Sequence, residues 1–177
     1  MVKGEFMDKK VEMKIRALER KDLLYIHKLH NTRNTMALWF REPYESVDEL
    51  ENLYTKHIHD DSERRFVIDI NGEFAGIIEL ITIDYIHRNT EIQIIIRKDF
   101  QGKCLAQSAM KKGIDYAFNI LNMYKVYLFV DSENSVAIHI YKKLGFQQEG
   151  ILRKQFFANG KYHDSIFMGI FKNEITE

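Results

Sequence analysis

The 177-residue sequence contains one cysteine, one proline and one tryptophan, and 26 Lys and Arg residues balance 26 Asp and Glu residues. A lone cysteine excludes a disulfide within the chain and suits a reducing compartment, so we expect a cytoplasmic location. A net charge of zero gives no electrostatic reason to expect nucleic acid or a membrane as a partner. No apolar run is long enough to span a bilayer.

The composition is that of a folded globular chain, with 45% hydrophobic and 29% charged residues. Its length suits one domain with a proper core. The first residues are polar and charged and lack the hydrophobic segment of a secretion signal. We therefore expect a flexible N-terminal leader over residues 1–13 and a single domain over residues 14–172.

Periodicity and turn signals predict an α+β domain or a mixed sheet, because helical and strand patterns are interspersed along the chain. Asn71-Gly72 is a strong hairpin signal, and Asn159-Gly160 marks a second turn. Ser46 and Glu49 form a capping-box pattern. The expected strands cover residues 14–18, 65–70, 74–83, 91–96 and 125–130 and two segments within 146–170, and the expected helices begin near 23 and cover 47–58, 105–121 and 135–144.

The stretch from Glu91 to Gln107 organises the chain. A β-branched, mostly apolar strand over residues 91–96 leads into a glycine-containing turn and then into an amphipathic helix. The start of such a helix presents free backbone N–H groups and the positive end of the helix dipole, which suit a pyrophosphate. An ordinary strand–turn–helix connection gives the same pattern, because one glycine in a turn is a weak signal.

The turn itself, Gln101-Gly102-Lys103-Cys104-Leu105-Ala106, resembles the Q/R-x-x-G-x-G/A signature of the GNAT superfamily of N-acetyltransferases. In that family the turn and helix start hold the pyrophosphate of acetyl-CoA, and the preceding strand pairs with the pantetheine arm. Cys104 stands where the family usually has its second glycine. The resemblance implies acetyl-CoA contacts at Ile94, Ile95, Ile96, Gln101, Gly102, Lys103, Cys104, Leu105, Ala106 and Gln107.

A second motif lies in the helix expected over residues 135–144. Asn134, Ala137, Tyr141 and Gly145-Phe146 resemble the family pattern N-x-x-A-x-x-x-Y-x-x-x-G-F. In the family the tyrosine lies near the acetyl sulfur and acts as general acid on the leaving thiolate, a role that suits a phenol protonated at neutral pH. An amphipathic core tyrosine is the alternative for Tyr141. The resemblance implies a mixed, mostly antiparallel sheet flanked by helices, and further cofactor contacts at Asn134, Ala137, Ile138, Tyr141 and Lys143.

An acidic segment runs from Glu42 to Glu63, with eight acids and one basic residue, Lys56, histidines aside. Trp39, Phe40, Tyr44 and Tyr54 lie in or beside it. A solvated helix face accounts for such a pattern, and so does a groove for a small cation, because carboxylates beside aromatic faces suit an alkyl chain that carries ammonium groups.

His57-Ile58-His59 invites comparison with a zinc site. The two histidines fall at the end of an expected helix, where positions i and i+2 diverge. No cysteine or third histidine accompanies them, so we expect no metal there.

The match extends beyond the superfamily motifs. The strings at residues 39–45, 57–60, 63–66, 86–88, 91–96 and 156–162 are similar to those of the bacterial spermidine/spermine N-acetyltransferases, and the similarity covers Arg16 to Ile170. It implies spermidine and spermine as partners, an allosteric polyamine site at subunit interfaces and a dodecameric homo-oligomer. Carried over by position, polyamine contacts fall on Met36, Glu42, Glu49, His57, Ile58, His59, Asp60, Glu91, Ile92 and Gln93.

Two positions depart from that subfamily. Arg41 and Thr82 stand where the subfamily usually has the acids of an interface metal ion. A guanidinium does not deprotonate, so we expect no metal there and weakened or altered allosteric polyamine binding. Arg41 is then available to pair with an acid across an interface.

The sequence thus predicts direct acetyl transfer from acetyl-CoA to a primary amine of spermidine or spermine in a ternary complex. Tyr141 is the expected acid, and Glu91 is the candidate group that accepts the amine proton, through water. Cys104 is not needed as a nucleophile. Two alternatives remain: a family member that acetylates another cationic amine, such as a protein N-terminus or an aminoglycoside, and a non-catalytic sensor of polyamine or acyl-CoA.

Overall fold

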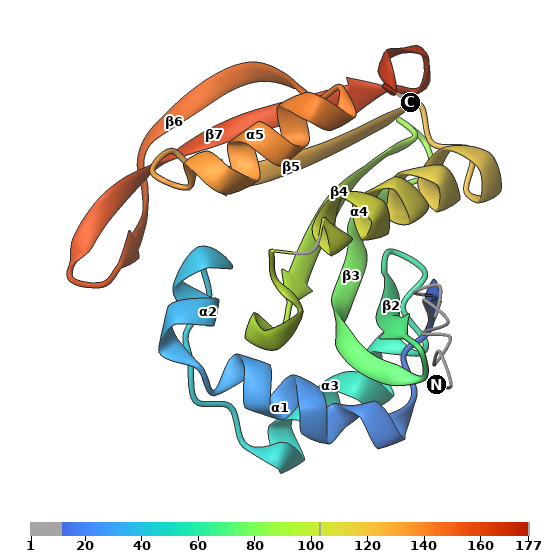
Figure 1. Ribbon diagram of the computed structural model, residues 1–177, viewed down its shortest axis with the longest axis vertical. Coiled ribbons are helices and arrows are strands. Elements are labelled where there is room, and N and C mark those ends of the chain that lie inside the picture. The colour runs from blue at the N-terminus through green and yellow to red at the C-terminus, as the bar shows by residue number, and fades with distance from the viewer. Residues whose placement is uncertain (1–11, 103, 177) are drawn as a thin grey trace, which may run out of the picture.

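The computed structural model describes residues 12–102 and 104–176 and contains one seven-stranded sheet in the order β1-β2-β3-β4-β5-β7-β6 (Figure 1). Neighbouring strands are antiparallel except β4 and β5, which are parallel. The expected mixed, mostly antiparallel sheet is confirmed. The strands are β1 (Met13–Ala17), β2 (Arg64–Ile70), β3 (Glu73–Asp84), β4 (Asn89–Ile96), β5 (Lys125–Asp131), β6 (Gln147–Ala158) and β7 (Lys161–Phe171).

Five α-helices accompany the sheet in the described part of the chain: α1 (Leu23–His30), α2 (Arg33–Leu38), α3 (Val47–His57), α4 (Leu105–Asp115) and α5 (Ser135–Leu144). A π-helical segment, Tyr116–Ile120, continues α4, and short 3₁₀ turns lie at Arg20–Asp22, Lys98–Phe100 and Lys172–Glu174. Among the helices of residues 12–102 and 104–176, none has the length and apolar character needed to cross a membrane.

Strand alternation divides the apolar residues between two cores, one on each face of the sheet. The larger core includes Ile78 and Ile92 together with residues of α4 and α5. The smaller core joins Ile77 and Ile95 to α1, α2 and α3. Gly113 lets α4 approach the sheet, because a Cβ there would come within 2.5 Å of Ile78 Cδ1.

Local sequence signals account for most element boundaries. Asn71 and Gly72 both have positive φ, as do Asn159 and Gly160, which confirms the two expected hairpin turns. Ser46 Oγ accepts a hydrogen bond from the Glu49 backbone N–H at 3.1 Å, and the Glu49 carboxylate accepts one from the Ser46 N–H at 2.7 Å. The capping box that starts α3 is therefore confirmed.

The ends of the ordered domain differ slightly from the expected ones. β1 begins at Met13, within the expected leader, and the Glu12 N–H donates to Asn71 Oδ1 at 3.0 Å. Residues 1–11 of that leader lie outside the described residues. At the other end, the turn over residues 172–174 continues past residue 172, and the Thr176 N–H donates to the Leu144 carbonyl at 3.3 Å.

Candidate active site

The parallel strands β4 and β5 pair over only three positions, and the last pair is Glu91 with Tyr127. Beyond that pair the two strands spread apart (Figure 1). The backbone groups of residues 92–96 that point away from β3 therefore face an open fork. Such an edge offers donors and acceptors to an extended ligand in the same way as to another strand.

Side chains along this part of β4 are already used in packing. Ile95 belongs to the smaller core, whereas Ile94 and Ile96 pack against the larger one. The three isoleucines predicted to contact the cofactor can thus reach a ligand in the fork mainly through their main chain.

The turn after β4 is closed by Gln101, whose side-chain amide donates to the Ile96 carbonyl at 2.9 Å. Helix α4 then begins at Leu105, and within residues 12–102 and 104–176 no side-chain hydrogen bond caps its N-terminus. The N–H groups of the first turn, which includes Ala106 and Gln107, are therefore available to an anion. Lys103, another predicted contact, lies outside the described residues.

Cys104 immediately precedes α4 in the left-handed region, with φ 56° and ψ 12°. This region favours glycine, which explains why a family with this turn usually has glycine here. The cysteine keeps the backbone conformation at a cost of about 1–2 kcal/mol. Its thiol is free and exposed.

Helix α5 carries the second motif. Asn134 Oδ1 accepts a hydrogen bond from the Ala137 N–H at 3.1 Å and so caps the helix. Ala137, Ile138 and Tyr141 pack against the larger core, and Gly145, with φ 107°, ends the helix. Lys143, by contrast, is exposed near the C-terminal end of α5.

The Tyr141 ring packs against Phe146, with ring centroids 5.9 Å apart. Burial raises the pKa of Tyr141 to about 12. The hydroxyl has no hydrogen-bond partner in the described ranges of the chain. A neutral phenol with a free O–H is a proton donor at physiological pH.

Glu91 lies beside Tyr127 at the closed end of the fork, and its carboxylate accepts a hydrogen bond from the Gln93 amide. Burial raises the pKa of Glu91 above its usual value, and the Gln93 hydrogen bond and the charge of Arg41 oppose that shift. A carboxylate with a raised pKa is better matched to accepting a proton near neutral pH. Ile92, between the two polar residues, points to the opposite face and packs in the larger core.

A cavity of about 130 Å³, lined by three acids, two arginines, two histidines and apolar side chains, lies between the sheet and helices α1 to α3. Met36, Glu42 and His57 line it, so three of the predicted polyamine contacts come together. Arg41 and Glu45 also line it.

Glu79, in the middle of β3, also lines this cavity. Glu79 is 1% exposed, and Arg65 forms an ion pair with its Oε1. Glu79 Oε2 and the Oε1 of Gln93, its cross-strand neighbour, are buried and have no partner within the described residues. Sequence reasoning did not assign Glu79 to a site, although a charged residue inside the apolar run Ile77-Ile78-Glu79-Leu80-Ile81 is a visible signal.

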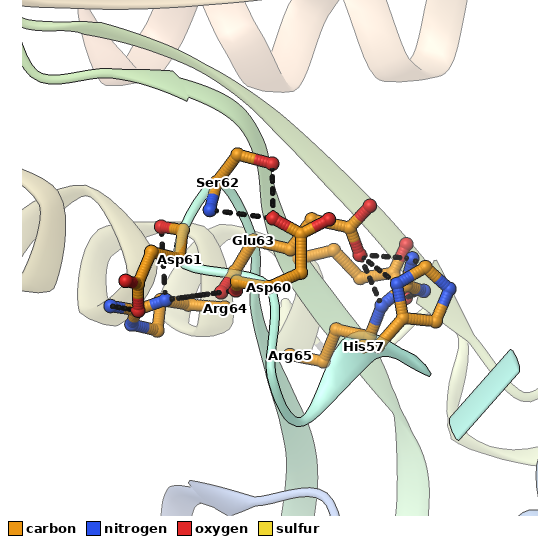
Figure 2. Close-up of polar contacts among 8 residues, drawn as sticks. His57, Asp60, Asp61, Ser62, Glu63, Arg64 and Arg65 are labelled. Atoms are coloured by element: carbon orange, nitrogen blue, oxygen red, sulfur yellow. Dashed lines mark hydrogen bonds and ion pairs between the residues drawn. The ribbon is translucent and has the colours of Figure 1, made fainter. Parts of the chain in front are cut away.

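Other predicted polyamine contacts do not line the cavity. Glu49 is used in the cap of α3, and Ile58 and His59 are exposed. Asp60 accepts hydrogen bonds from the backbone and side chain of Ser62 (Figure 2). Glu49 thus lies at the start of α3, whereas Ile58, His59 and Asp60 follow its end.

The segment after α3 forms a polar network (Figure 2). Glu63 Oε2 lies 2.6 Å from His57 Nδ1 and 2.8 Å from Arg65 Nη2. Burial and the Arg65 charge lower the pKa of His57. The network brings Asp60 and Glu63, rather than His59, toward His57.

Arg41 and Thr82, the two positions that depart from the subfamily, each contact an aromatic residue. The Arg41 guanidinium lies over the Trp39 ring, 5.0 Å from its centroid. Thr82 has a positive φ of 49°, and its hydroxyl shares a 2.8 Å hydrogen bond with the hydroxyl of Tyr127. Tyr127, which the sequence did not single out, thus links β5 to β3 across the closed end of the fork.

Comparison with known proteins identifies the same superfamily that the sequence motifs indicate. The model of the Acetyltransferase (GNAT) family matches residues 26–146. The chain is 54% identical over 162 residues to the spermidine N(1)-acetyltransferase of Escherichia coli K12, covering 92% of this chain and 87% of that one.

Solved structures extend the comparison. The spermidine N-acetyltransferase of Vibrio cholerae in complex with CoA and spermine matches with a TM-score of 0.90 at 51% identity, covering 92% of this chain and 96% of that one. A dodecameric structure of the Vibrio cholerae enzyme matches with a TM-score of 0.82 at 49% identity, covering 91% of this chain and 94% of that one.

Proposed function

From the finding that this chain belongs to the acetyltransferase (GNAT) family, we propose that it transfers the acetyl group of acetyl-CoA to a primary amine of spermidine or spermine. The observation that carries the proposal is the fork between β4 and β5, which joins an open strand edge to the uncapped start of α4. Acetylation removes one positive charge from a polyamine and thereby weakens its hold on nucleic acid.

The residues of the fork fit two parts of acetyl-CoA. The free backbone groups of β4 suit the amide-containing pantetheine arm, and the first turn of α4 suits the pyrophosphate. We also assign Asn134, the N-cap of α5, and the exposed Lys143 to the cofactor site, as the family resemblance implies. Acetyl-CoA supplies an activated acetyl thioester, so no nucleophile of the chain is required and Cys104 has no covalent role.

Tyr141 and Glu91 manage the protons. Tyr141 is held neutral by burial and donates its proton to the departing thiolate. The attacking amine must be neutral, whereas free polyamine amines are mostly protonated at pH 7. Glu91, with its raised pKa, accepts that proton through water.

The cavity between the sheet and helices α1 to α3, whose three acids outnumber its two arginines, supports a polyamine as the cationic partner. Buried acceptor oxygens without a partner destabilise a protein by about 1–3 kcal/mol each. Glu79, which lines the cavity, and its cross-strand neighbour Gln93 each carry one such oxygen, Oε2 and Oε1 respectively. An ammonium group brings both the positive charge and the N–H donors that they lack.

We extend the proposal to assembly and location. The Vibrio cholerae relative has been solved as a dodecamer, and we propose a homo-oligomer for this chain as well. A cytoplasmic location is part of the same proposal, because the exposed Cys104 thiol suits a reducing compartment.

The experiment that tests the function measures thiol release from acetyl-CoA with spermidine, with spermine and with a lysine-terminated peptide. We expect turnover with the polyamines and little with the peptide. Turnover with the peptide alone would keep the fold and discard the polyamine as acceptor. CoA binding without turnover of any acceptor would favour the sensor over the enzyme.

A further inference from the structure

A second polar cluster, made of residues not assigned above, lies at the C-terminal end of β5, next to Asn134. Asp131 ends that strand, Glu133 follows in the loop before α5, and His163 lies on the neighbouring strand β7. Asp131 and His163 are 6% and 7% exposed, whereas Glu133 is exposed. One ligand atom from each of the three lies within 4.8 Å of the others.

Both ring nitrogens of His163 face oxygen atoms. Nε2 lies 3.2 Å from the Ala158 carbonyl, which can only accept, so Nε2 carries a proton. Nδ1 lies 3.0 Å from Asp131 Oδ2 and 3.8 Å from Glu133 Oε2. A neutral imidazole with its proton on Nε2 therefore presents a bare lone pair to two carboxylates, and this arrangement requires a cation at Nδ1.

The alignment at Nδ1 favours a metal ion over a proton. Nδ1 is buried and makes no hydrogen bond within the described ranges, although Asp131 is close, because the carboxylate lies off the direction in which an N–H would point. Donor atoms that share one metal ion at about 2.0–2.2 Å lie roughly 3–4 Å from one another. The separations of 3.0 and 3.8 Å fall in that range.

The ligands are also held as metal ligands usually are. The Nε2–H of His163 donates to a backbone carbonyl, which fixes the tautomer that leaves Nδ1 free. The Phe156 ring stacks on the imidazole, with centroids 5.0 Å apart and ring planes 18° from parallel. Asp131 Oδ1 accepts from the Glu133 N–H at 2.9 Å, which orients the carboxylate.

One further polar atom adjoins the cluster. Ser165 pairs directly with Asp131 across the β5–β7 ladder and is two residues from His163, so the three side chains share a face of the sheet. Ser165 is 0% exposed, and its hydroxyl has no partner in the part of the chain described. A metal-bound water at the site would give that hydroxyl a partner.

The other His–acid cluster in the described residues, His57 with Asp60 and Glu63, is different (Figure 2). The Arg65 guanidinium lies 3.4 Å from His57 Nε2 and also binds Glu63. The guanidinium can only donate, so Nε2 of His57 is the bare nitrogen and Nδ1, 2.6 Å from Glu63 Oε2, carries the proton, the reverse of the arrangement at His163. Beside His163, the exposed Lys161 binds both carboxylate oxygens of Glu133, at 2.8 and 2.7 Å, so a metal ion would share that carboxylate with the ammonium group.

We propose that Asp131, Glu133 and His163 form a binding site for a divalent first-row metal ion, with zinc as the best match to one imidazole nitrogen and two carboxylate oxygens. The ion ties the β6–β7 hairpin to the loop that leads into α5. Because the Asn134 N–H donates to the Asp131 carbonyl at 2.9 Å, the ion also fixes the start of the helix that carries Tyr141. The acetyl transfer proposed above uses no metal, so the ion would act on it only through the position of this helix.

The test uses the full chain after dialysis against a chelator. Zinc and, separately, manganese are titrated by calorimetry, and bound metal per chain is counted by elemental mass spectrometry. We expect one zinc per chain, an affinity at least about tenfold weaker in His163→Gln and in Asp131→Asn, and a thermal unfolding midpoint that rises with zinc only when the site is intact. His57→Gln removes the imidazole of the other cluster and should keep full zinc binding.

Circular dichroism establishes that each variant is folded, and the conservative Asp131→Asn change provides a second reading if His163→Gln unfolds. The proposal is overturned if the wild type binds no zinc or manganese, if His57→Gln alone abolishes binding, or if both site variants bind as the wild type does. Absent metal binding together with an imidazolium signal for His163 by NMR would show that the cation is a proton.

Discussion

Replacing Tyr141 by phenylalanine removes one hydroxyl and leaves the packing of the ring against Phe146 in place. The hydroxyl forms no hydrogen bond with residues of the described chain, so the change leaves no buried partner unsatisfied. We therefore expect the free energy of unfolding to change by less than about 0.5 kcal/mol. Any large loss of activity then reports on chemistry and not on folding.

The expected loss follows from the role of the phenol. General acid catalysis contributes about 100-fold to 10,000-fold in rate, which corresponds to about 3–5 kcal/mol of transition-state stabilisation. The thiolate that Tyr141 protonates forms only as the bond breaks, so the loss should fall on kcat while the affinity for acetyl-CoA stays near the wild-type value.

The raised pKa adds a second, independent expectation. With a pKa of about 12, the phenol remains about 99% protonated at pH 10, where an ordinary tyrosine is about half ionised. Ionisation of Tyr141 should therefore cause no fall in wild-type kcat below about pH 11. Thiol release from acetyl-CoA with saturating spermidine, followed across this pH range, measures both the pH dependence and the mutant loss. Tyr162→Phe, at an exposed tyrosine on β7, is the matched control.

Two results would refute this reasoning. Turnover of Tyr141→Phe within about threefold of wild type would remove the tyrosine from the chemistry, since even the lower bound of acid catalysis exceeds that. A fall in kcat near pH 10 that is absent in Tyr141→Phe would support Tyr141 as the general acid but would contradict a pKa raised by burial.

Three further predictions concern the proton acceptor, the acid stability and the fork. Burial raises the pKa of Glu91, so wild-type turnover should rise with pH over a range above the usual glutamate pKa. Glu91→Gln should abolish this rise and lower kcat about 100-fold. A near-normal pH–rate profile in the variant would exclude Glu91 as the proton acceptor. Burial acts to raise the pKa of Asp22, but the 2.7 and 2.9 Å hydrogen bonds from Arg16 prevail and lower it. The Arg16–Asp22 pair therefore stabilises the fold at pH values above the pKa of Asp22 in the unfolded chain. This stabilisation is lost as the pH falls through the pKa of Asp22 in the folded protein. Asp22→Asn should lower the free energy of unfolding, measured with urea, by about 2 kcal/mol at pH 7. The loss should be smaller below about pH 4. An equal loss at both pH values would show that the charge of Asp22 does not stabilise the fold. A Cβ at Gly76 would come within 2.1 Å of a β4 carbonyl oxygen, so Gly76→Ala should destabilise the chain by about 1–3 kcal/mol and weaken CoA binding by calorimetry. Gly150→Ala, where nothing lies within 4 Å, is its control, and equal effects would show that the clash is not responsible.

The sequence by itself determined the local structure of this chain. Hairpin turns at Asn71-Gly72 and Asn159-Gly160, the capping box at Ser46 and the glycine end of α5 depend on a few adjacent residues, so their signals are complete within a short window. The family motifs around Gln101 and Asn134 were equally readable, and the match to the family model confirms the family they indicated. The roles of individual site residues stay predictions.

Tertiary structure alone decided which residues meet. The acids of residues 42–63 looked like one patch, yet Glu42 lines the cavity, Glu49 caps α3 and Asp60 closes a turn. Ile92 and Glu91 are adjacent in sequence but lie on opposite faces of β4, because successive strand residues alternate.

The residues that sequence reasoning missed came from distant segments. Glu79 faces Gln93 across β3 and β4, Tyr127 reaches Thr82, and His163 meets Asp131 from the next strand. No local pattern encodes these pairs, because strand order and register set them, and both follow from how the whole sheet buries its two apolar faces. The sequence therefore fixes the elements and the family, and the folded sheet decides which polar groups lie close enough to act together.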